Sequence, residues 1–237
     1  MAHIARASVT QALLVLIVTT AAMIGPANAR AAEAIASVIA LRGEVTAVDT
    51  DGTTRPLGED ASIYPRDRIA TERRAAVSFR FTDGTRVALG GNTVFDVEDY
   101  DYSDEPSGNR FTTRLTRGVA RFVTGLIAKR RPRAVSVNTP VATIGVRGTH
   151  FVSEVAEDES ATVILLEPED DPVRKTAIEI ANAAGSVTIE DPGYGTEVAD
   201  AQTAPTPPRR MQIQTVERMV RQVNAARRMR MPRGPMR

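Results

Sequence analysis

Apolar and polar residues alternate along most of the chain in short runs that predict β-strands. The clearest run is AAVSFRF at residues 75–81, in which every second side chain is Ala, Val or Phe. Asp83-Gly84 follows and predicts a two-residue hairpin turn, because glycine tolerates a positive φ at the second turn position. Residues 85–89 then provide the partner strand. Because such segments recur at spacings of about ten residues, we expect a mainly β fold of many short antiparallel strands in a β-roll, a short solenoid or a sandwich.

The C-terminal segment follows a different period and predicts an amphipathic helix over residues 211–231. Its apolar residues are spaced by three and four positions and form one stripe, Ile213, Val216, Val220 and Val223. The preceding segment 199–210 is rich in proline and predicts a linker, with Thr206 as the N-cap of the helix. The β-rich residues 30–198 then form one domain, and residues 232–237 form a short tail.

Charge is divided unevenly between the body of the chain and its C-terminal segment. The formal net charge is +1, but residues 205–237 contain nine arginines and one acid, a balance of +8. The remaining residues therefore carry +1 minus +8, or −7. Three interpretations of the basic segment remain open: a disordered tail, a helix lying on an anionic membrane surface or envelope polymer, and a helix docked on the acidic body. No nucleic-acid partner is expected, because the basic segment contains no aromatic residue.

Residues 1–29 have the three parts of a secretory signal peptide. Arg6 provides the positive start, an apolar stretch extends from Ala12 to Ile24, and Ala27-Asn28-Ala29 forms a cleavage site of the A-x-A type. An apolar helix of this length spans about 20 Å, which is short of the roughly 30 Å hydrocarbon core of a bilayer. We therefore expect cleavage after Ala29 and a periplasmic protein, with an extracellular or membrane-associated location as the alternative.

The composition excludes several classes of catalytic and metal site. The chain has no cysteine and only two histidines, His3 and His150, which rules out thiol chemistry and zinc sites rich in Cys or His. No catalytic residue, metal or cofactor is expected. The alternative is an envelope hydrolase that acts on carbohydrate or peptide through two carboxylates, drawn from Asp96, Glu98, Asp99 and Asp101.

One acidic segment allows both a ligand-binding and a solvated interpretation. Residues 98–109, EDYDYSDEPSGN, contain enough carboxylates to bind a cation. They lack the spacing of an EF-hand loop, however, and are more typical of a solvated loop.

Residues 138–151, NTPVATIGVRGTHF, form the most distinctive stretch. Apolar residues at both parities of its middle part, VATIGV, predict a strand covered on both faces. Gly145 and Gly148 are expected to bend the backbone or to let another strand approach closely. We expect Arg147 to hydrogen-bond main-chain carbonyls left free at these bends, with anion binding as the alternative. His150 is expected to be an ordinary strand residue, and the spacing of three places it opposite Arg147 if both lie in one regular strand.

This stretch resembles the signature of the FecR domain, T-P-x-A-x-x-G-V/I-R-G-T-x-F. The matching residues, which we take as structural or partner-binding, are Thr139, Pro140, Gly145, Arg147, Gly148, Thr149 and Phe151. Upstream, residues 66–93 resemble the family's G-D-x-I-x-T and D-G-S/T motifs, except that Arg66 replaces the usual glycine before Asp67. Downstream, residues 161–198 resemble the family's last hairpin, including GSVTI at 185–189 and the G-x-G-T-x-V end at 193–198.

The resemblance implies a folded, non-enzymatic module of the cell envelope. The family includes the periplasmic parts of anti-sigma regulators that respond to outer-membrane siderophore transducers. Those regulators also have a cytoplasmic helical domain and a transmembrane helix, which we do not expect here, so the anti-sigma role is not carried over. We expect the domain to bind a partner protein or an anionic envelope polymer, in signalling or scaffolding.

Overall fold

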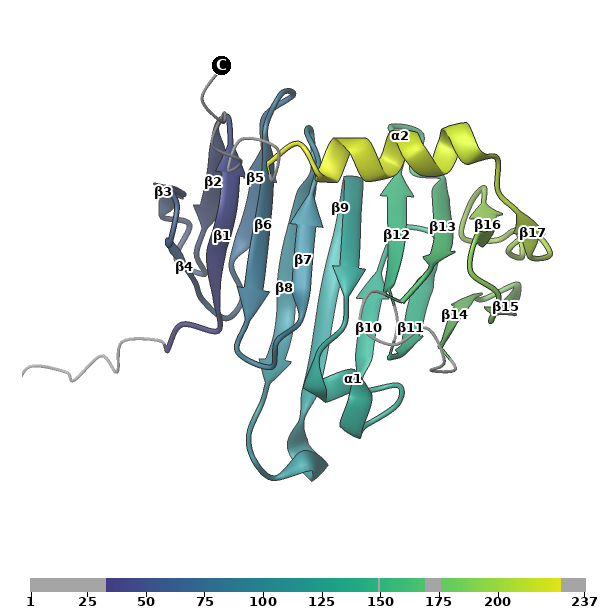
Figure 1. Ribbon diagram of the computed structural model, residues 1–237, viewed down its shortest axis with the longest axis horizontal. Coiled ribbons are helices and arrows are strands. Elements are labelled where there is room, and N and C mark those ends of the chain that lie inside the picture. Colours follow the sequence, from purple (N-terminus) through teal and green to yellow (C-terminus); the bar gives the residue numbers. More distant parts are fainter. Residues whose placement is uncertain (1–32, 149, 169–175, 227–237) are drawn as a thin grey trace, which may run out of the picture. The chain divides into compact units, whose positions relative to one another are not determined.

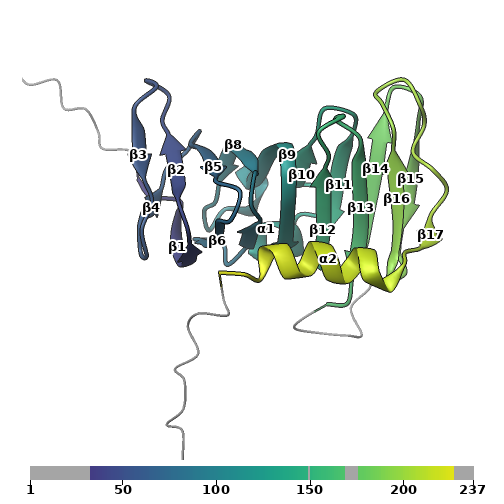
Figure 2. The same cartoon turned by 90° about the horizontal axis from the view of Figure 1, so that it is seen from above.

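The structure, a computed structural model, describes residues 33–148, 150–168 and 176–226. The expected signal peptide and the last part of the expected C-terminal helix lie outside these residues. Within them, the strands form two layers that share β9 (Arg110–Val123), as Figures 1 and 2 show. The described residues also form the helices α1 (Leu126–Arg130) and α2 (Ile213–Val223) and the 3-10 turn η1 (Pro106–Gly108).

Each sheet has β9 at its centre. Sheet A runs in the spatial order β4 (Ser62–Ile63), β1 (Ala36–Arg42), β6 (Ala76–Phe81), β7 (Arg86–Leu89), β9, β12 (His150–Val155), β13 (Ala161–Leu166), β16 (Tyr194–Val198) and β17 (Arg209–Arg210). Sheet B runs in the order β3 (Thr54–Pro56), β2 (Val45–Val48), β5 (Arg68–Thr71), β8 (Val94–Asp101), β9, β10 (Val135–Asn138), β11 (Thr143–Arg147), β14 (Ala177–Asn182) and β15 (Gly185–Ile189). Neighbouring strands are antiparallel, except that β9 and β10 are parallel. The predicted mainly β fold is confirmed, in the form of a sandwich.

The long strand β9 passes from sheet B to sheet A at Gly118. Its first half pairs with β8 and β10, and its second half pairs with β7 and β12. Gly118 has a φ of +88°, and a Cβ at this position would lie 2.6 Å from the Cα of Thr93. Glycine is required by both the backbone angle and the close approach. This residue therefore fixes the point at which the strand changes sheet.

The predicted hairpin is confirmed as β6–β7, but its loop has three residues instead of two. The N–H of Phe81 donates to the carbonyl of Thr85 at 2.9 Å, which leaves residues 82–84 as the loop. Gly84 has a φ of +84° and is the last loop residue. A type I turn followed by a left-handed glycine is the usual three-residue connection. Gly84 therefore has the predicted positive φ, but it is the third residue of the loop instead of the second.

The space between the two sheets holds the main hydrophobic core. Side chains at alternate strand positions face inward, as in β6, where Val77, Phe79 and Phe81 are at most 2% exposed. All six phenylalanines of the chain belong to this core. The few large aromatic side chains are therefore concentrated between the sheets, and the outer faces are built from other residue types.

Helix α2 lies on the outer face of sheet A and adds a third layer (Figure 2). Met219 and Val223 are buried there, in one cluster with Val119, Val152, Ile164 and Leu166. Ile213, which the periodicity placed in the apolar stripe, is instead 67% exposed. In this structure the helix is docked on the body of its own chain. None of the helices among the described residues is long and apolar enough to cross a membrane.

The segment that leads into α2 follows a different path from the expected one. Thr206 is not the N-cap: its hydroxyl accepts the N–H of Glu197 at 3.0 Å, and the helix begins after Gln212, which makes no side-chain cap. Pro205 is buried. The chain therefore runs along the end of the sandwich and forms β17 before the helix starts.

The terminal strands of both sheets are short or covered. Sheet A ends in the two-residue strands β4 and β17, and one end of sheet B is β3, whose last residue is Pro56. At the other end of sheet B, the Pro-rich segment lies beside β15, since a Cβ on Gly185 would be 3.2 Å from the Cβ of Ala204.

Candidate functional site

The signature stretch, residues 138–151, begins with the turn between β10 and β11. The Thr139 hydroxyl donates to the carbonyl of Ala142 at 2.8 Å and accepts the N–H of the same residue at 3.0 Å. The main-chain N–H of Thr139 also donates to this carbonyl. Pro140 lies inside the turn, where its fixed φ is favourable and no donor is needed. Thr139 and Pro140 thus shape the hairpin.

Strand β11 is buried on one face only. Ile144 and Val146 point into the core and are fully buried, whereas Thr143 and Arg147 are exposed on the outer face of sheet B. The prediction of a strand covered on both faces is therefore wrong. The apolar residues that suggested it lie in the preceding turn and do not belong to the strand.

Gly148 is the point where the chain leaves sheet B and enters sheet A. It is buried between β11 and β12 and has a φ of +55°, which favours glycine. Thr149 lies outside the described residues. Phe151 points into the core and stacks on Phe122, with ring centroids 4.8 Å apart. Gly148 and Phe151 therefore position the two strands.

His150 lies in a different strand and a different sheet from Arg147. The three-residue spacing therefore does not place the two side chains on opposite faces of one strand. Its Nε2 accepts a hydrogen bond from Nε of Arg121 at 2.7 Å, and its Nδ1 lies 2.6 Å from the carbonyl oxygen of Glu167. Because arginine can only donate, this pairing requires a neutral ring with the proton on Nδ1. The contacts are those of a buried structural histidine.

Gly145 occupies the middle of β11 on the outer face of sheet B. Its φ is not positive, and a Cβ at this position would meet only the carbonyl oxygen of Glu179, at 3.8 Å. That distance is an ordinary van der Waals contact. The expected bend or close approach is therefore not found at Gly145, and the backbone does not require glycine here.

Arg147 points outward two residues further along β11. It is exposed, and its guanidinium makes no hydrogen bond or ion pair with any described residue. The expected hydrogen bonds to main-chain carbonyls are absent from the described part of the chain. Arg147 also lines an open hollow of about 430 Å³, whose rim includes Glu190 and Asp191.

Polar side chains from four strands form a connected network on the same face as Gly145, beginning at Thr143. The Thr143 hydroxyl donates to Oδ1 of Asn138 at 3.1 Å, and Nδ2 of Asn138 donates to Oε2 of Glu98 at 2.7 Å. Nε of Arg114 contacts the other oxygen of Glu98 at 2.5 Å. The outer face of sheet B is thus polar and internally hydrogen-bonded, and Arg147 stands outside this network.

The carboxylates considered for hydrolysis lie on strand β8, on the same outer face. Asp96 and Glu98 each pair with one arginine, and Arg110 pairs with both Asp99 and Asp101. The first part of the expected acidic loop is in fact a continuation of this strand. Two carboxylates facing each other across a cleft, as hydrolysis of a glycoside needs, are not formed by these residues.

Asp83, in the β6–β7 loop, fastens this loop to α1. Its carboxylate accepts the N–H and the hydroxyl of Thr85 at 2.9 and 2.8 Å, and the N–H of Ile127 at 3.3 Å. Its own N–H donates to the Tyr100 hydroxyl, and burial raises the pKa of Tyr100. A Cβ on Gly125 would lie 2.5 Å from the main-chain nitrogen of Thr85. The D-G-T motif is therefore a structural element.

Arg66 and Asp67 form a second structural motif, at the start of β5. Asp67 is buried, and its Oδ2 accepts the N–H of Tyr64 at 2.8 Å and pairs with Arg55. Arg66 has a φ of +66°, in the left-handed region that glycine adopts without strain. This angle explains physically why glycine is usual at that position of the signature.

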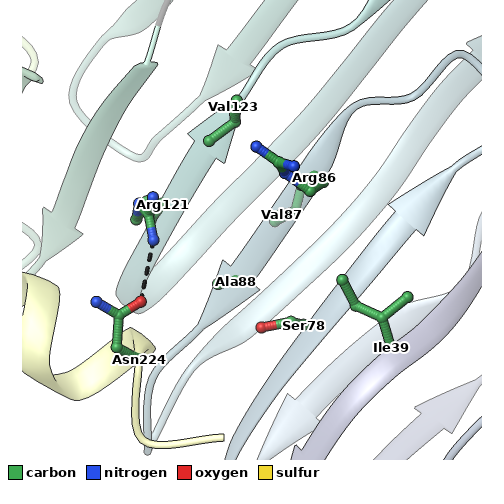
Figure 3. A pocket seen from close by; sticks show the side chains of 8 residues that line it. All are labelled: Ile39, Ser78, Arg86, Val87, Ala88, Arg121, Val123 and Asn224. Carbon is green, nitrogen blue, oxygen red and sulfur yellow. Dashed lines mark hydrogen bonds between the residues drawn. The ribbon is translucent and has the colours of Figure 1, made fainter. Parts of the chain in front are cut away.

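A small cavity lies on the outer face of sheet A, beside the C-terminal end of α2 (Figure 3). Arg86, Arg121 and Asn224 contribute to its lining, and Arg121 donates to Oδ1 of Asn224 at 3.0 Å. Its volume of about 20 Å³ accommodates one water molecule. The cavity is thus too small for an organic substrate.

Residues 67–168, which include the signature stretch, match the family described as FecR protein. The expected resemblance is confirmed for this part of the chain. No curated protein matches the sequence.

Two crystal structures of a candidate anti-sigma factor from Parabacteroides distasonis are similar to this chain, each with a TM-score of 0.48 and 18% identity. The similarity covers 65% of this chain and 64% of that one, so less than two thirds of its length is spanned. A cell surface anchoring domain is similar with a TM-score of 0.29 and 29% identity, over 31% of this chain and 99% of that domain.

Proposed function

We propose, with the FecR-family match of residues 67–168 as the premise, that this chain is a non-enzymatic module of the cell envelope. It binds a partner protein through the outer face of sheet B, around Gly145 and Arg147. The chain acts in the periplasm after removal of residues 1–29, in signalling or scaffolding.

The observation that carries this proposal is the division of the signature stretch into two groups. Thr139 hydrogen-bonds across the β10–β11 turn, and Gly148 adopts the left-handed φ where the chain crosses between the sheets. Gly145 and Arg147 do not stabilise the fold in a comparable way. A Cβ fits at Gly145, and the Arg147 guanidinium is unpaired among the described residues. Both residues lie on the same side of β11, since they are two positions apart.

The chemistry of this surface suits a protein partner. A glycine keeps the sheet surface low, so that another backbone can approach it. Arg147 offers a planar set of donors that can bind a carboxylate or main-chain carbonyls in bidentate fashion. Exposed arginines of this kind are enriched among the residues that dominate protein–protein binding. The surrounding polar network is already hydrogen-bonded and provides a preformed rim.

Photo-crosslinking in intact cells tests this proposal directly. A photoreactive residue at Thr143, which is exposed on the same face, should yield one crosslinked protein. Arg147→Ala and Gly145→Lys should each reduce its yield by roughly tenfold or more, as loss of a binding hot spot does. Arg117→Ala removes an exposed arginine near the middle of β9, next to Gly118, and serves as the matched control.

The thermal midpoint of each variant must stay within a few degrees of the wild type for the crosslinking result to count. An unchanged crosslink in folded Arg147→Ala protein contradicts the proposed face. Crosslinking to an anionic envelope polymer, with no protein adduct, contradicts the proposed class of partner.

A further inference from the structure

The outer face of sheet A is apolar where α2 crosses it, in contrast to the polar outer face of sheet B. Its floor consists of side chains from β9, β12 and β13, namely Val119, Val152, Ile164 and Leu166. A sandwich sheet that faces water on one side normally alternates apolar and polar residues. In β13, ATVILL, five of the six residues are buried. These strands are therefore built to receive an element on their outer face.

Helix α2 fills this groove without being part of the main core. Among the described residues, the core between the sheets contains none beyond Val198. Helix α2 contributes to one smaller cluster on the outer face, and Ala226, just after the helix, belongs to another. The helix has 11 residues and no side-chain N-cap. Isolated helices of this length are marginal in water, so α2 depends on the groove for its structure.

Polar contacts at both ends of the groove fix the register of its occupant. Arg218 makes two hydrogen bonds to the carboxylate of Glu154, at 2.5 and 2.7 Å. At the other end, Asn224 accepts a hydrogen bond from Arg121 (Figure 3). The buried Met219 and Val223 lie between these two contacts, one turn apart. The groove thus selects a helix with a basic residue directly before the first apolar anchor and an amide directly after the second.

We propose that this groove binds an amphipathic helix of a partner protein, and that α2 is an internal occupant which the partner helix displaces. The proposal rests on the proposed function only in assuming that a partner protein exists. Charge complementarity supports a basic helix, because Glu154, which pairs with Arg218, lines a hollow beside α2 together with Glu157 and Glu159 of the β12–β13 loop. Among the described residues, Arg117 is the one basic residue in the lining of this hollow. Arg218 of α2 uses this acidic surface in the chain itself.

A displacement experiment with the chain's own helix sequence tests the groove. Met219→Asp/Val223→Asp in residues 30–237 removes both buried anchors and should eject α2. A fluorescent peptide with the sequence of residues 211–226 should then bind this variant at least tenfold more tightly than it binds the wild type, measured by fluorescence anisotropy. The wild type is the matched control, because its groove is occupied.

Charge reversal supplies the specificity control. A peptide carrying Arg218→Glu should bind the double variant at least tenfold more weakly, and Glu154→Arg in the protein should restore its binding. Equal binding of the peptide to the wild type and to the folded double variant overturns the proposal. So does insensitivity to charge reversal at Glu154.

If the double variant does not fold, as judged by circular dichroism, a protease site between Arg210 and Met211 replaces it. After cleavage of this otherwise unaltered chain, the labelled peptide should exchange with the severed helix, and absence of exchange overturns the proposal.

A wild-type dimer that the peptide converts to monomer assigns the groove to α2 of a second copy and overturns the assignment to a partner. Loss of peptide binding with an intact, Arg147-dependent crosslink in cells refutes the groove alone and leaves the proposed function standing.

Discussion

The two glycines of the signature stretch should respond in opposite directions to the same substitution. Gly148 has a φ of +55°, and a non-glycine residue in this region is destabilised by about 1–2 kcal/mol. Alanine recovers about 0.4–1 kcal/mol by restricting the unfolded chain. The net loss for Gly148→Ala is therefore about 0–1.6 kcal/mol of unfolding free energy.

Gly145→Ala should instead be neutral or stabilising. Its φ is not positive, and the new Cβ would contact only the Glu179 carbonyl oxygen, at 3.8 Å. Glycine inside a strand is less stable than alanine by roughly 0.5–1 kcal/mol. For a domain of this size, each 1 kcal/mol corresponds to about 2–4 °C in the thermal midpoint. The two variants should therefore differ by several degrees, with the wild type between them.

Thermal unfolding followed by far-ultraviolet circular dichroism measures this difference. Gly52→Ala is the matched control for the backbone angle alone, because Gly52 has a φ of +81° and no neighbour within 4 Å of a built Cβ. It should lose about as much stability as Gly148→Ala. If Gly145→Ala lowers the midpoint as far as Gly148→Ala does, then Gly145 has a structural task. Gly145 would then not mark a binding surface.

Arg66→Gly should raise the unfolding free energy by roughly 0.5–1 kcal/mol, because it removes a Cβ from a left-handed residue. Urea unfolding measures the gain, and Arg66→Ala, which keeps the Cβ, should show none. Gly125→Ala should destabilise the fold by about 1–3 kcal/mol through overlap with the loop that carries Asp83; an unchanged urea midpoint would contradict the packing described for α1. Hydrogen bonds from the Thr203 hydroxyl, and then from nearby main-chain N–H groups, lower the pKa of Asp200. The resulting stabilisation is present at neutral pH and is lost as the pH falls below about 4 and through the lowered pKa. Asp200→Asn should therefore reduce the difference between thermal midpoints measured at pH 7 and pH 3, and an unaltered difference would refute this role.

Local sequence patterns were sufficient for the individual strands and for the character of α2. The alternation at residues 75–81 and the glycine at position 84 are local properties, and they identified the β6–β7 hairpin correctly. The exact loop length was missed, because a two-residue turn and a three-residue turn with a left-handed glycine share the same Asp-Gly pair. The spacing of apolar residues in α2 predicted its buried side in part: Val223 is buried, and Val216 and Val220 are partly buried, whereas Ile213 is exposed. Met219, which lies beside the predicted stripe, is the other buried residue of the helix.

The arrangement of the two sheets could not be predicted, because it depends on contacts between distant residues. The local sequence does not distinguish Gly118 from other strand glycines, because only the fold brings Thr93 against it. The outward position of Gly145 depends on where the turn after Thr139 ends, which shifts the side-chain parity of the following strand. One local signal does mark the surface under α2. The apolar run ATVILL at residues 161–166 is typical of a strand covered on both faces.

The short terminal strands of the sandwich have a consequence for the behaviour of the protein at high concentration. Strands added side by side extend in one dimension, and an exposed edge can act as a template for the same strand of another molecule. Edges of only two residues, as in β4 and β17, provide too few hydrogen bonds for such growth, and Pro56 lacks the donor that β3 would need at its end. The remaining terminal strand is β15, and the Pro-rich segment lies beside it. The terminal strands among the described residues therefore offer little template for edge-to-edge growth, while the outer face of sheet B stays open.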